Sequence, residues 1–302
     1  MIKESLRGKK IAITGSTGFL GTALVELLLR EIDDVQIRLL IRPSGKRSAE
    51  KRLERDILRN DAFDSLRNSL GNEDFDHLTN SQIKTLPADI SKDDLGLDDE
   101  GLLELSQCDV IIHSAAAVSF DEPLDRAAEV NLMGPVRLVK TLQDLDASPH
   151  LVMVSTCYVA GNRKGRAPEK PLSQSPFYVP LNWREETEAA RRTRSYIEDD
   201  SRRSENLERF RNEAKNELGA PGISLIATKT EQIRERWVKD KMVEAGRERA
   251  TSLGFPDAYA FTKAMAEQAV QEIRGTIPLS IVRPSIIESS WEKPNSGWIR
   301  GF

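Results

Sequence analysis

A chain of 302 residues, 39% of them hydrophobic, is long enough to bury one large α/β core or two small ones. A formal net charge of −4 argues against nucleic-acid binding, because nucleic-acid-binding proteins usually present a net basic face. The two cysteines, Cys108 and Cys157, form no disulfide framework and no CxxC or Cys/His cluster, so we expect no metal site and a cytoplasmic protein. The N-terminus lacks the apolar core of a secretory signal, and no apolar run reaches transmembrane length.

The first predicted element is a nucleotide-binding glycine loop at residues 15–21, Gly-Ser-Thr-Gly-Phe-Leu-Gly, between an apolar strand and an apolar helix. Gly15 permits the tight turn, Gly18 lets the backbone approach a pyrophosphate, and Gly21 allows close packing of the helix. The N-terminus of that helix favours the charge of a phosphate. The predicted cofactor contacts here are Thr14, Gly15, Thr17, Gly18, Phe19, Leu20 and Gly21.

The end of the second predicted strand indicates which dinucleotide is bound. Folds that select NAD often carry Asp or Glu there, to hold the ribose hydroxyls. Here the strand ends in Arg42, with Lys46 and Arg47 close behind, and an arginine suits the extra phosphate of NADP. We predict NADPH as the cofactor, with a solvated basic loop as the alternative interpretation.

Two further segments are predicted to approach the cofactor. Asp89 is placed where a side chain could meet the adenine, and a turn aspartate fits the same pattern. The strand that begins at Val110 changes into small residues, which let the backbone pass close to a ligand. The predicted contacts in these segments are Asp89, Ile90, Ser114, Ala115 and Ala116.

The chemistry is predicted at Tyr259 and Lys263, which share one face of a helix because they are four residues apart. A cation beside a phenol favours the phenolate, so Lys263 is expected to lower the pKa of Tyr259 and to make it a usable proton donor near neutral pH. Upstream, Ser155 and Thr156 follow a buried strand, at the edge where ligands of open α/β sheets bind. A hydroxyl there can donate a hydrogen bond to a substrate carbonyl.

Asn131 stands out as a polar residue in a mostly apolar predicted helix. Its amide could hold a local kink and a water molecule. It could equally be a buried amide that is bonded to the backbone, and the sequence favours neither interpretation.

Residues 164–252 interrupt the α/β pattern with a segment in which acidic and basic residues are mixed. A sparse apolar stripe runs through it, made of Ile233, Trp237, Met242 and Val243. Mixed-sign charge is typical of a solvated helix surface, so we predict a helical insertion within one reductase domain over residues 1–302. A lid, or a docking surface for a polyanion such as the phosphates of coenzyme A, is the alternative.

Strands and helices alternate along the rest of the chain, which predicts a doubly wound parallel sheet, a Rossmann fold of the α/β class. Strands are expected at residues 10–14, 35–41, 110–117, 151–154 and 279–284, and helices at 22–30, 125–145 and 257–273.

Five stretches together resemble the fatty acyl-CoA reductases, a group within the extended short-chain dehydrogenase/reductases. They are residues 13–21, 40–43, 113–122, 154–159 and 282–290. The last stretch, which continues to Gly297-Trp298-Ile299, is the part specific to the acyl-CoA reductases. The glycine loop and the Tyr/Lys pair are shared by the whole superfamily.

The resemblance implies an enzyme that uses NADPH to reduce a fatty acyl-CoA thioester to a fatty aldehyde or a fatty alcohol. It makes Tyr259 the proton donor, and Lys263 the residue that tunes Tyr259 and bonds the nicotinamide ribose. It makes Thr156 the donor to the substrate carbonyl and Asn131 the holder of a proton-relay water. Pro284, at the end of the last strand, completes the predicted cofactor contacts.

The chain ends at Phe302, soon after the terminal strand motif of the group, whereas relatives continue with a C-terminal portion that forms much of the acyl-binding site. We therefore expect an acyl-binding portion to be missing, so that the chain binds NADPH and reduces acyl-CoA poorly. Acyl chain length, the final product and the oligomeric state stay open, and loose membrane association fits an amphiphilic substrate.

Two other functions share these residues. One is an extended short-chain reductase or epimerase that acts on a nucleotide sugar or another carbonyl compound. The other is a non-catalytic NADP-binding protein that senses redox state. The charged insertion and the segment from Ser285 to Trp298 argue against the first, and the presence of both Tyr259 and Lys263 argues against the second.

Overall fold

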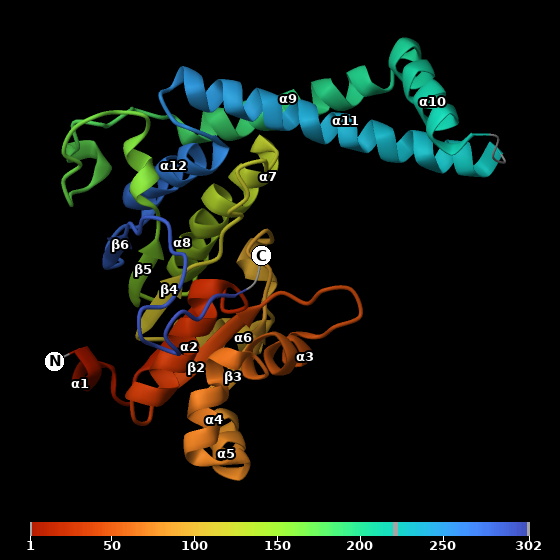
Figure 1. Ribbon diagram of the computed structural model, residues 1–302. Helices are drawn as coiled ribbons and strands as arrows, with labels where there is room; N and C mark the ends of the chain where they lie inside the picture. The colour runs from red at the N-terminus through yellow and green to blue at the C-terminus, as the bar shows by residue number, and fades with distance from the viewer. Residues whose placement is uncertain (1, 220–222, 301–302) are drawn as a thin grey trace. The chain divides into compact units, whose positions relative to one another are not determined.

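A six-stranded parallel sheet organises the computed structural model, which describes residues 2–219 and 223–300 (Figure 1). The strand order is β3-β2-β1-β4-β5-β6, so the order reverses between β1 and β4. The strands are β1 (Lys10–Thr14), β2 (Gln36–Ile41), β3 (Ile83–Pro87), β4 (Val110–His113), β5 (His150–Val154) and β6 (Leu279–Val282). The predicted doubly wound sheet is thereby confirmed, and ligands of such sheets bind outside the carboxyl ends of the strands at the reversal point.

Helices connect and flank these strands. They are α1 (Ile2–Leu6), α2 (Phe19–Glu31), α3 (Ala49–Arg52), α4 (Asp64–Leu70), α5 (Asn72–Gln82), α6 (Asp99–Ser106), α7 (Leu124–Ala127), α8 (Gly134–Asp144), α9 (Trp183–Ser201), α10 (Ser204–Leu218), α11 (Ile223–Ser252) and α12 (Ala258–Ile273). Two π-helical segments, η1 (Leu53–Leu58) and η4 (Ala128–Met133), continue α3 and α7. The helices between residues 49 and 82, and α6, were not predicted from the sequence.

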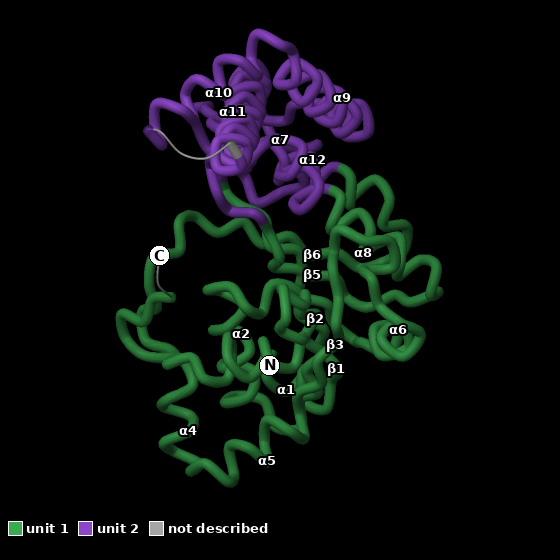
Figure 2. The backbone as a smooth tube through the Cα atoms, turned by 90° about the vertical axis from the view of Figure 1, so that its right-hand side faces the viewer, with its two compact units in different colours: residues 1–116, 133–157, 269–302 green, residues 117–132, 158–268 purple. Residues whose placement is uncertain are grey.

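The chain divides into two compact units, coloured separately in Figure 2. Unit 1 comprises residues 1–116, 133–157 and 269–302, and it contains the whole sheet. Unit 2 comprises residues 117–132 and 158–268.

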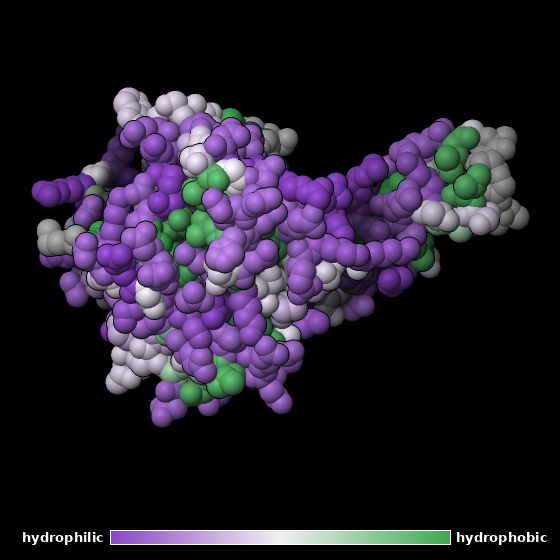
Figure 3. Space-filling view, turned by 90° about the horizontal axis from the view of Figure 1, so that it is seen from below, coloured by the Kyte–Doolittle hydropathy of each residue, from purple (hydrophilic) through white to green (hydrophobic). Residues whose placement is uncertain are grey.

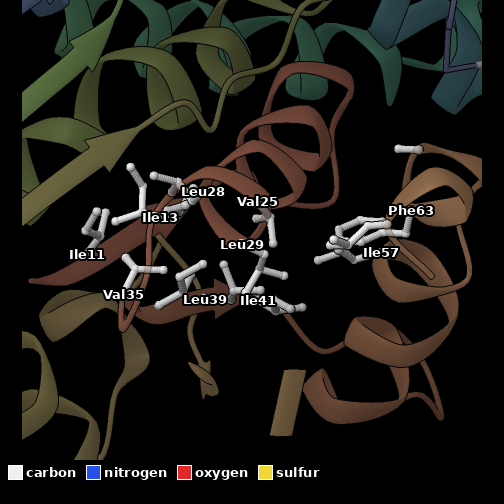
Figure 4. Close-up of a cluster of buried hydrophobic side chains, with 14 of the residues drawn as sticks. Ile11, Ile13, Val25, Leu28, Leu29, Val35, Leu39, Ile41, Ile57 and Phe63 are labelled. Atoms are coloured by element: carbon white, nitrogen blue, oxygen red, sulfur yellow. The ribbon is translucent and has the colours of Figure 1, made fainter. Parts of the chain in front are cut away.

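The core of unit 1 forms where apolar residues of β1 and β2 pack against the apolar face of α2. In β1 and β2 every second residue points to that face, and in α2 the apolar residues recur at intervals of three and four. The residues brought together include Ile11, Ile13, Val25, Leu28, Leu29, Leu39 and Ile41, all buried (Figure 4). Ile37 of β2 belongs to the same cluster. Phe63 and Phe75 extend this core and pack edge to face, with ring centroids 6.2 Å apart.

The helix predicted over residues 125–145 is not continuous. It consists of α7, the π-helical segment η4 and α8, and Asn131 lies inside the π segment. A π segment leaves the regular hydrogen-bond ladder and is frequent at functional sites. Similarly, the strand predicted over residues 110–117 ends at His113.

Unit 2 contains the helices α9, α10 and α11, which fall within the predicted insertion. The expected apolar stripe packs there: Met242 lies with Ile197 and Val238, and Ile233 lies with Phe210. The unit also takes in residues 117–132 and the first part of α12, so the proposed limits of the insertion, 164–252, stay a prediction.

Hydrophilic side chains predominate on the molecular face drawn in Figure 3, where apolar residues gather only in small groups. A charged fraction of 30% leads one to expect such a surface. Among the residues that the structure describes, no helix is both long and apolar enough to cross a membrane.

An ion cluster on α6 joins three parallel strands of unit 1. Glu104 accepts hydrogen bonds from Arg38 Nε of β2 at 2.7 Å, from Lys84 Nζ of β3 at 3.0 Å and from Lys10 Nζ of β1 at 3.3 Å. The hydrogen bond from Arg38 is the largest cause that lowers the pKa of Glu104 from 4.5 to about 2, against the opposing effect of burial. Because Arg38 is itself buried, Glu104 is its necessary counter-charge.

Glu104→Gln should lower the free energy of unfolding by about 2–3 kcal/mol at pH 7. The pKa of Glu104 is lower in the folded than in the unfolded chain, so this stabilisation is complete above the ordinary value of 4.5 and disappears as the pH falls toward about 2. Urea denaturation across that pH range measures the difference. Glu100→Gln is the control, because Glu100 pairs with the same Lys84 but is 73% exposed, and its loss should cost under about 0.5 kcal/mol.

Candidate functional site

In the glycine loop of unit 1, backbone segments cross so closely that there is no room for a side chain at Gly15 or Gly21. A Cβ atom on Gly15 would lie 2.6 Å from the Ala115 backbone nitrogen, and Gly15 has a φ of +75°. A Cβ on Gly21 would lie 2.2 Å from the Gly15 carbonyl oxygen. Gly18 is the N-cap of α2 and has no side chain to cap the helix, so the first N–H groups of α2 are open to a ligand. The three roles predicted for these glycines fit this geometry.

The ends of β1 and β4 are tied together beside this loop. Thr14 Oγ1 hydrogen-bonds His113 Nδ1 at 2.9 Å and accepts from the Ala115 backbone N–H at 3.2 Å. Ser114 Oγ donates to the Thr14 carbonyl at 2.7 Å. His113 is buried in this contact, which fits a structural role. The predicted cofactor residues Thr14, Ser114 and Ala115 therefore lie together at the carboxyl ends of β1 and β4.

Two buried hydroxyls at these strand ends lack partners among the described residues. They are Ser16 Oγ in the glycine loop and Ser155 Oγ after β5. A buried polar atom without a partner costs about 1–3 kcal/mol, so such groups normally meet water or a ligand. The open helix end, the glycine crossing and these hydroxyls fit the pyrophosphate and ribose of a dinucleotide.

Arg42 and Asp89 mark the ends of β2 and β3. Asp89 accepts hydrogen bonds from the Ser91 backbone N–H at 3.0 Å and from Ser91 Oγ at 2.7 Å, so it closes a turn. Burial raises the pKa of Asp89, but the Ser91 hydrogen bonds and the charge of Arg42 outweigh it and lower the pKa overall. These bonds support the turn interpretation, and the adenine contact stays a prediction.

The remaining predicted residues of unit 1 lie at other strand ends. Thr156 is buried after β5, and the next residue, Cys157, donates its backbone N–H to the Pro284 carbonyl at 2.9 Å. Ile90 packs against Gly134 at the start of α8 and accepts from Arg137 through its carbonyl oxygen at 3.4 Å.

Tyr259 and Lys263 both lie in the part of α12 that belongs to unit 2. Tyr259 is half-buried, and its ring meets the Phe120 ring edge to face with centroids 6.3 Å apart. Lys263 is only 2% exposed. Burial lowers the pKa of Lys263 to about 8, and the negative charge of Glu267 opposes the change.

Asn131 is joined to the same helix by hydrogen bonds. Its Nδ2 donates to the Ala117 carbonyl at 3.1 Å and to Thr262 Oγ1 at 3.1 Å, and its Oδ1 accepts from the Ala117 N–H at 2.8 Å. Thr262 Oγ1 in turn donates to the Ala258 carbonyl at 2.7 Å. The structure thus bears out a buried amide bonded to the backbone, and it connects Asn131 to the turn between Tyr259 and Lys263.

Glu267 and Thr262 were not among the predicted site residues. Glu267 is 2% exposed and lies one helical turn after Lys263. The spacing of four residues between Lys263 and Glu267 was the available signal, because a charge pair at that interval shares one helix face. Thr262 had no comparable signal, since its partner lies 131 residues away in the sequence.

A parallel sheet with a glycine loop at its reversal point defines a nucleotide-binding α/β protein of the Rossmann type. A family model described as "Male sterility protein", of the NAD-binding kind, matches residues 13–302, and the chain belongs to this family.

Curated relatives confirm the resemblance to fatty acyl-CoA reductases. The chain is 34% identical to "Fatty acyl-CoA reductase 2, chloroplastic" of Arabidopsis thaliana, over 98% of the chain and 44% of the relative. It is 32% identical to "Alcohol-forming fatty acyl-CoA reductase" of Simmondsia chinensis, over 99% of the chain and 56% of the relative. The chain therefore spans about half the length of the curated relatives that it matches.

Solved structures confirm the fold. The terminal R domain of the myxalamid PKS-NRPS pathway has a TM-score of 0.55 at 21% identity, over 93% of this chain and 50% of that one. An R domain of a nonribosomal peptide synthetase from Mycobacterium tuberculosis has a TM-score of 0.52 at 20% identity, over 93% of this chain and 48% of that one.

Gly15→Ala should abolish binding of a nicotinamide dinucleotide and destabilise the chain by several kcal/mol, because the new Cβ collides with backbone rather than with a movable side chain. Gly71→Ala is the matched control. Gly71 has a similar φ of +82° but nothing within 4 Å of the added Cβ, so it isolates the conformational cost of about 1–3 kcal/mol. Urea denaturation and titration with a nicotinamide dinucleotide measure both variants, and equal effects would contradict the crossing.

Proposed function

We propose that this chain is the cofactor-binding reductase part of an enzyme that uses NADPH to reduce a fatty acyl-CoA thioester to a fatty aldehyde, a fatty alcohol or both. The observation that carries the proposal is the glycine crossing at Gly15 and Gly21, in a chain of this family whose relatives are named fatty acyl-CoA reductases. NADPH rather than NADH is supported by Arg42, Arg47 and Arg52 around the end of β2, where the ribose is recognised in this fold.

NADPH, when bound, supplies the hydride that reduces the thioester carbonyl carbon. We propose that the Thr156 hydroxyl donates a hydrogen bond to the carbonyl oxygen and stabilises the charge that develops there. The Tyr259 phenol then gives its proton to that oxygen, which yields a hemithioacetal. Loss of coenzyme A as its thiol leaves the aldehyde, and a second hydride with a second proton yields the alcohol.

The roles proposed for Lys263 and Asn131 follow from their surroundings. A buried ammonium group near a phenol stabilises the phenolate left after proton transfer and can donate to a ribose hydroxyl. Asn131 holds the turn of α12 through Thr262, and we propose that it also orders a relay water. The two free cysteines are in keeping with the cytoplasmic location that we propose, although one relative is named chloroplastic.

Tyr259→Phe should reduce acyl-CoA-dependent NADPH oxidation by about 10²-fold or more while NADPH affinity stays within about twofold. The variant keeps the ring that contacts Phe120 and removes only the proton donor. The assay uses a long-chain acyl-CoA, with residues 1–302 and with the longest natural protein that contains them. Tyr196→Phe on α9, 64% exposed, is the matched control and should not change the rate.

Three results would redirect the proposal. Turnover of a nucleotide sugar instead of acyl-CoA would favour the epimerase alternative. NADPH binding without turnover of any carbonyl compound, in the longest natural protein, would favour the redox sensor. Robust acyl-CoA turnover by residues 1–302 alone would contradict the expectation that an acyl-binding portion is needed.

The rate should fall as the pH rises past about 8, because Lys263 then loses the charge on which its proposed role depends. Glu267→Gln removes the one charge that raises this pKa among the described residues, so it should shift the alkaline limb to lower pH. The pH profile of NADPH oxidation measures the shift. Glu26→Gln serves as a comparison, because Glu26 is an equally buried glutamate with a basic partner, Arg30, at the same helical spacing. Glu26→Gln should lower the free energy of unfolding and leave the alkaline limb of the pH profile unchanged.

A further inference from the structure

The segment after β6 folds back on itself and forms a strap, defined here as residues 290–300. The Ser290 N–H donates to the Trp298 carbonyl at 2.9 Å, and the Gly297 N–H donates to the Ser290 carbonyl at 2.9 Å. These paired bonds close the loop and present Trp298 and Arg300 to the rest of unit 1. The proposed mechanism assigns no role to this strap.

Trp298 anchors the strap to the helix of the glycine loop. It is 6% exposed and belongs to the core cluster of β1, β2 and α2. Its ring stacks on Phe19, the first residue of α2, with centroids 4.9 Å apart and an interplanar angle of 18°. Its Nε1 donates to Asp61 Oδ1 at 2.7 Å. By contrast, Trp291 of the same strap is 94% exposed.

This anchor places the Arg300 guanidinium along the first turn of α2. Nη1 donates to the Gly18 carbonyl at 3.5 Å and to Thr22 Oγ1. Nη2 donates to the Asp56 carbonyl at 2.6 Å. Arg300 therefore connects the glycine-loop helix with η1, the π segment that follows the basic loop after β2.

Positive charge gathers around Asp56. Arg52 Nε lies 2.9 Å from Asp56 Oδ2, and Arg47 Nη1 lies 3.9 Å from Asp56 Oδ1. Arg52 Nη1 also donates to the Arg42 carbonyl at 2.7 Å, so the group reaches the end of β2. Burial is the main cause that lowers the pKa of Arg300, Asp56 opposes it, and the charge of Arg52 lowers it further.

The Asp56 carboxylate pairs with Arg52 and lies near Arg47. The Asp56 backbone carbonyl accepts from Arg300, which also feels the charge of Asp61. Three guanidinium groups near two carboxylates leave an excess of positive charge, which a phosphate dianion can neutralise. In this fold the pyrophosphate lies at the N-terminus of the glycine-loop helix, and the ribose of the adenosine lies at the end of β2. Arg300 contacts the N-terminus of the glycine-loop helix through the Gly18 carbonyl. It also contacts Asp56, which pairs with Arg52 from the segment that follows β2. A planar guanidinium also matches phosphate oxygens in geometry better than an ammonium does.

We propose that Arg300 is a ligand of the 2′-phosphate of NADPH, so that the choice of cofactor depends on the strap as well as on the basic residues after β2. Trp298 is the positioning residue that holds Arg300 in place. The inference rests on the cofactor part of the proposed function and needs no acyl-CoA chemistry.

The test compares dissociation constants of NADPH and NADH, measured by calorimetric titration of the purified chain. Arg300→Ala should weaken NADPH binding about tenfold or more and leave NADH binding within about twofold. NADH lacks the 2′-phosphate, so its unchanged binding also shows that the glycine loop is intact. Trp298→Ala should reproduce the loss of selectivity, whereas Trp291→Ala should not.

Arg59→Ala is the matched charge control. Arg59 follows η1 and pairs with Glu54, but its side chain is 70% exposed and it does not contact Asp56 in the described structure. It should leave both constants unchanged. If Arg300→Ala fails to fold, Arg300→Gln removes the charge and keeps an N–H donor on a shorter side chain.

If Arg300→Gln weakens the binding of NADPH and NADH equally, the proposal is overturned. Arg300 would then bind the pyrophosphate or stabilise the fold. Unchanged NADPH binding, or a parent chain without preference for NADPH, would overturn it as well. Failure of acyl-CoA reduction leaves these constants unaffected, so the two proposals fail separately.

Discussion

The close approach of the Gly15 backbone to the Ala115 backbone is the constraint on which the rest of the candidate site depends. Two parallel strands, β1 and β4, end side by side, and the chain after each must turn away within a space that has no room for a Cβ. The turn at Gly15 sets where α2 begins, and Gly21 lets that helix lie directly on the loop. No capping side chain bonds the first N–H groups of α2, which leaves them available to a ligand. A phosphate site is thus a consequence of backbone geometry and owes little to individual side chains.

A second constraint is the burial of charge on α12. Lys263 and Glu267 are both almost completely buried, and bringing an ammonium group out of water is costly unless an opposite charge accompanies it. The balance leaves the pKa of Lys263 at about 8, close to neutral pH, and perturbed values of this kind are common where protons are transferred. Asn131 and Thr262 fix the same turn by hydrogen bonds, so the buried charge lies in a rigid frame.

Elements with a strong local pattern were predictable from the sequence. The strand at residues 10–14, the glycine loop and the α12 helix follow from apolar runs, glycine spacing and a periodic face, and the structure places them within a few residues of expectation. The π segment at Asn131 was not predictable, since it depends on contacts to Ala117 and Thr262. The same holds for the strap, whose anchor joins Phe19 to Trp298 across nearly the whole chain. Local sequence specifies secondary structure, whereas these features depend on partners that only the folded chain brings together.

The pairing of charges separates a solvated surface from a binding surface, although both are rich in arginine. In unit 2 several arginines of the predicted insertion have carboxylate partners of their own: for example, Arg194 pairs with Asp125, and Arg249 pairs with Glu186. Arg234 is buried and pairs with both Glu198 and Glu231, and the hydrogen bond that it donates to Glu231 is the main cause that raises its pKa. Arginines paired in this way contribute little field for an outside anion. A docking surface for coenzyme A phosphates on the insertion stays a prediction. In unit 1, Arg47 and Arg52 share the Asp56 carboxylate and Arg300 donates to the Asp56 backbone carbonyl, so the guanidinium groups gathered beside the glycine loop outnumber their carboxylate partners. The same residue type therefore forms ion pairs within unit 2, whereas in unit 1 it carries the proposed recognition of a phosphate.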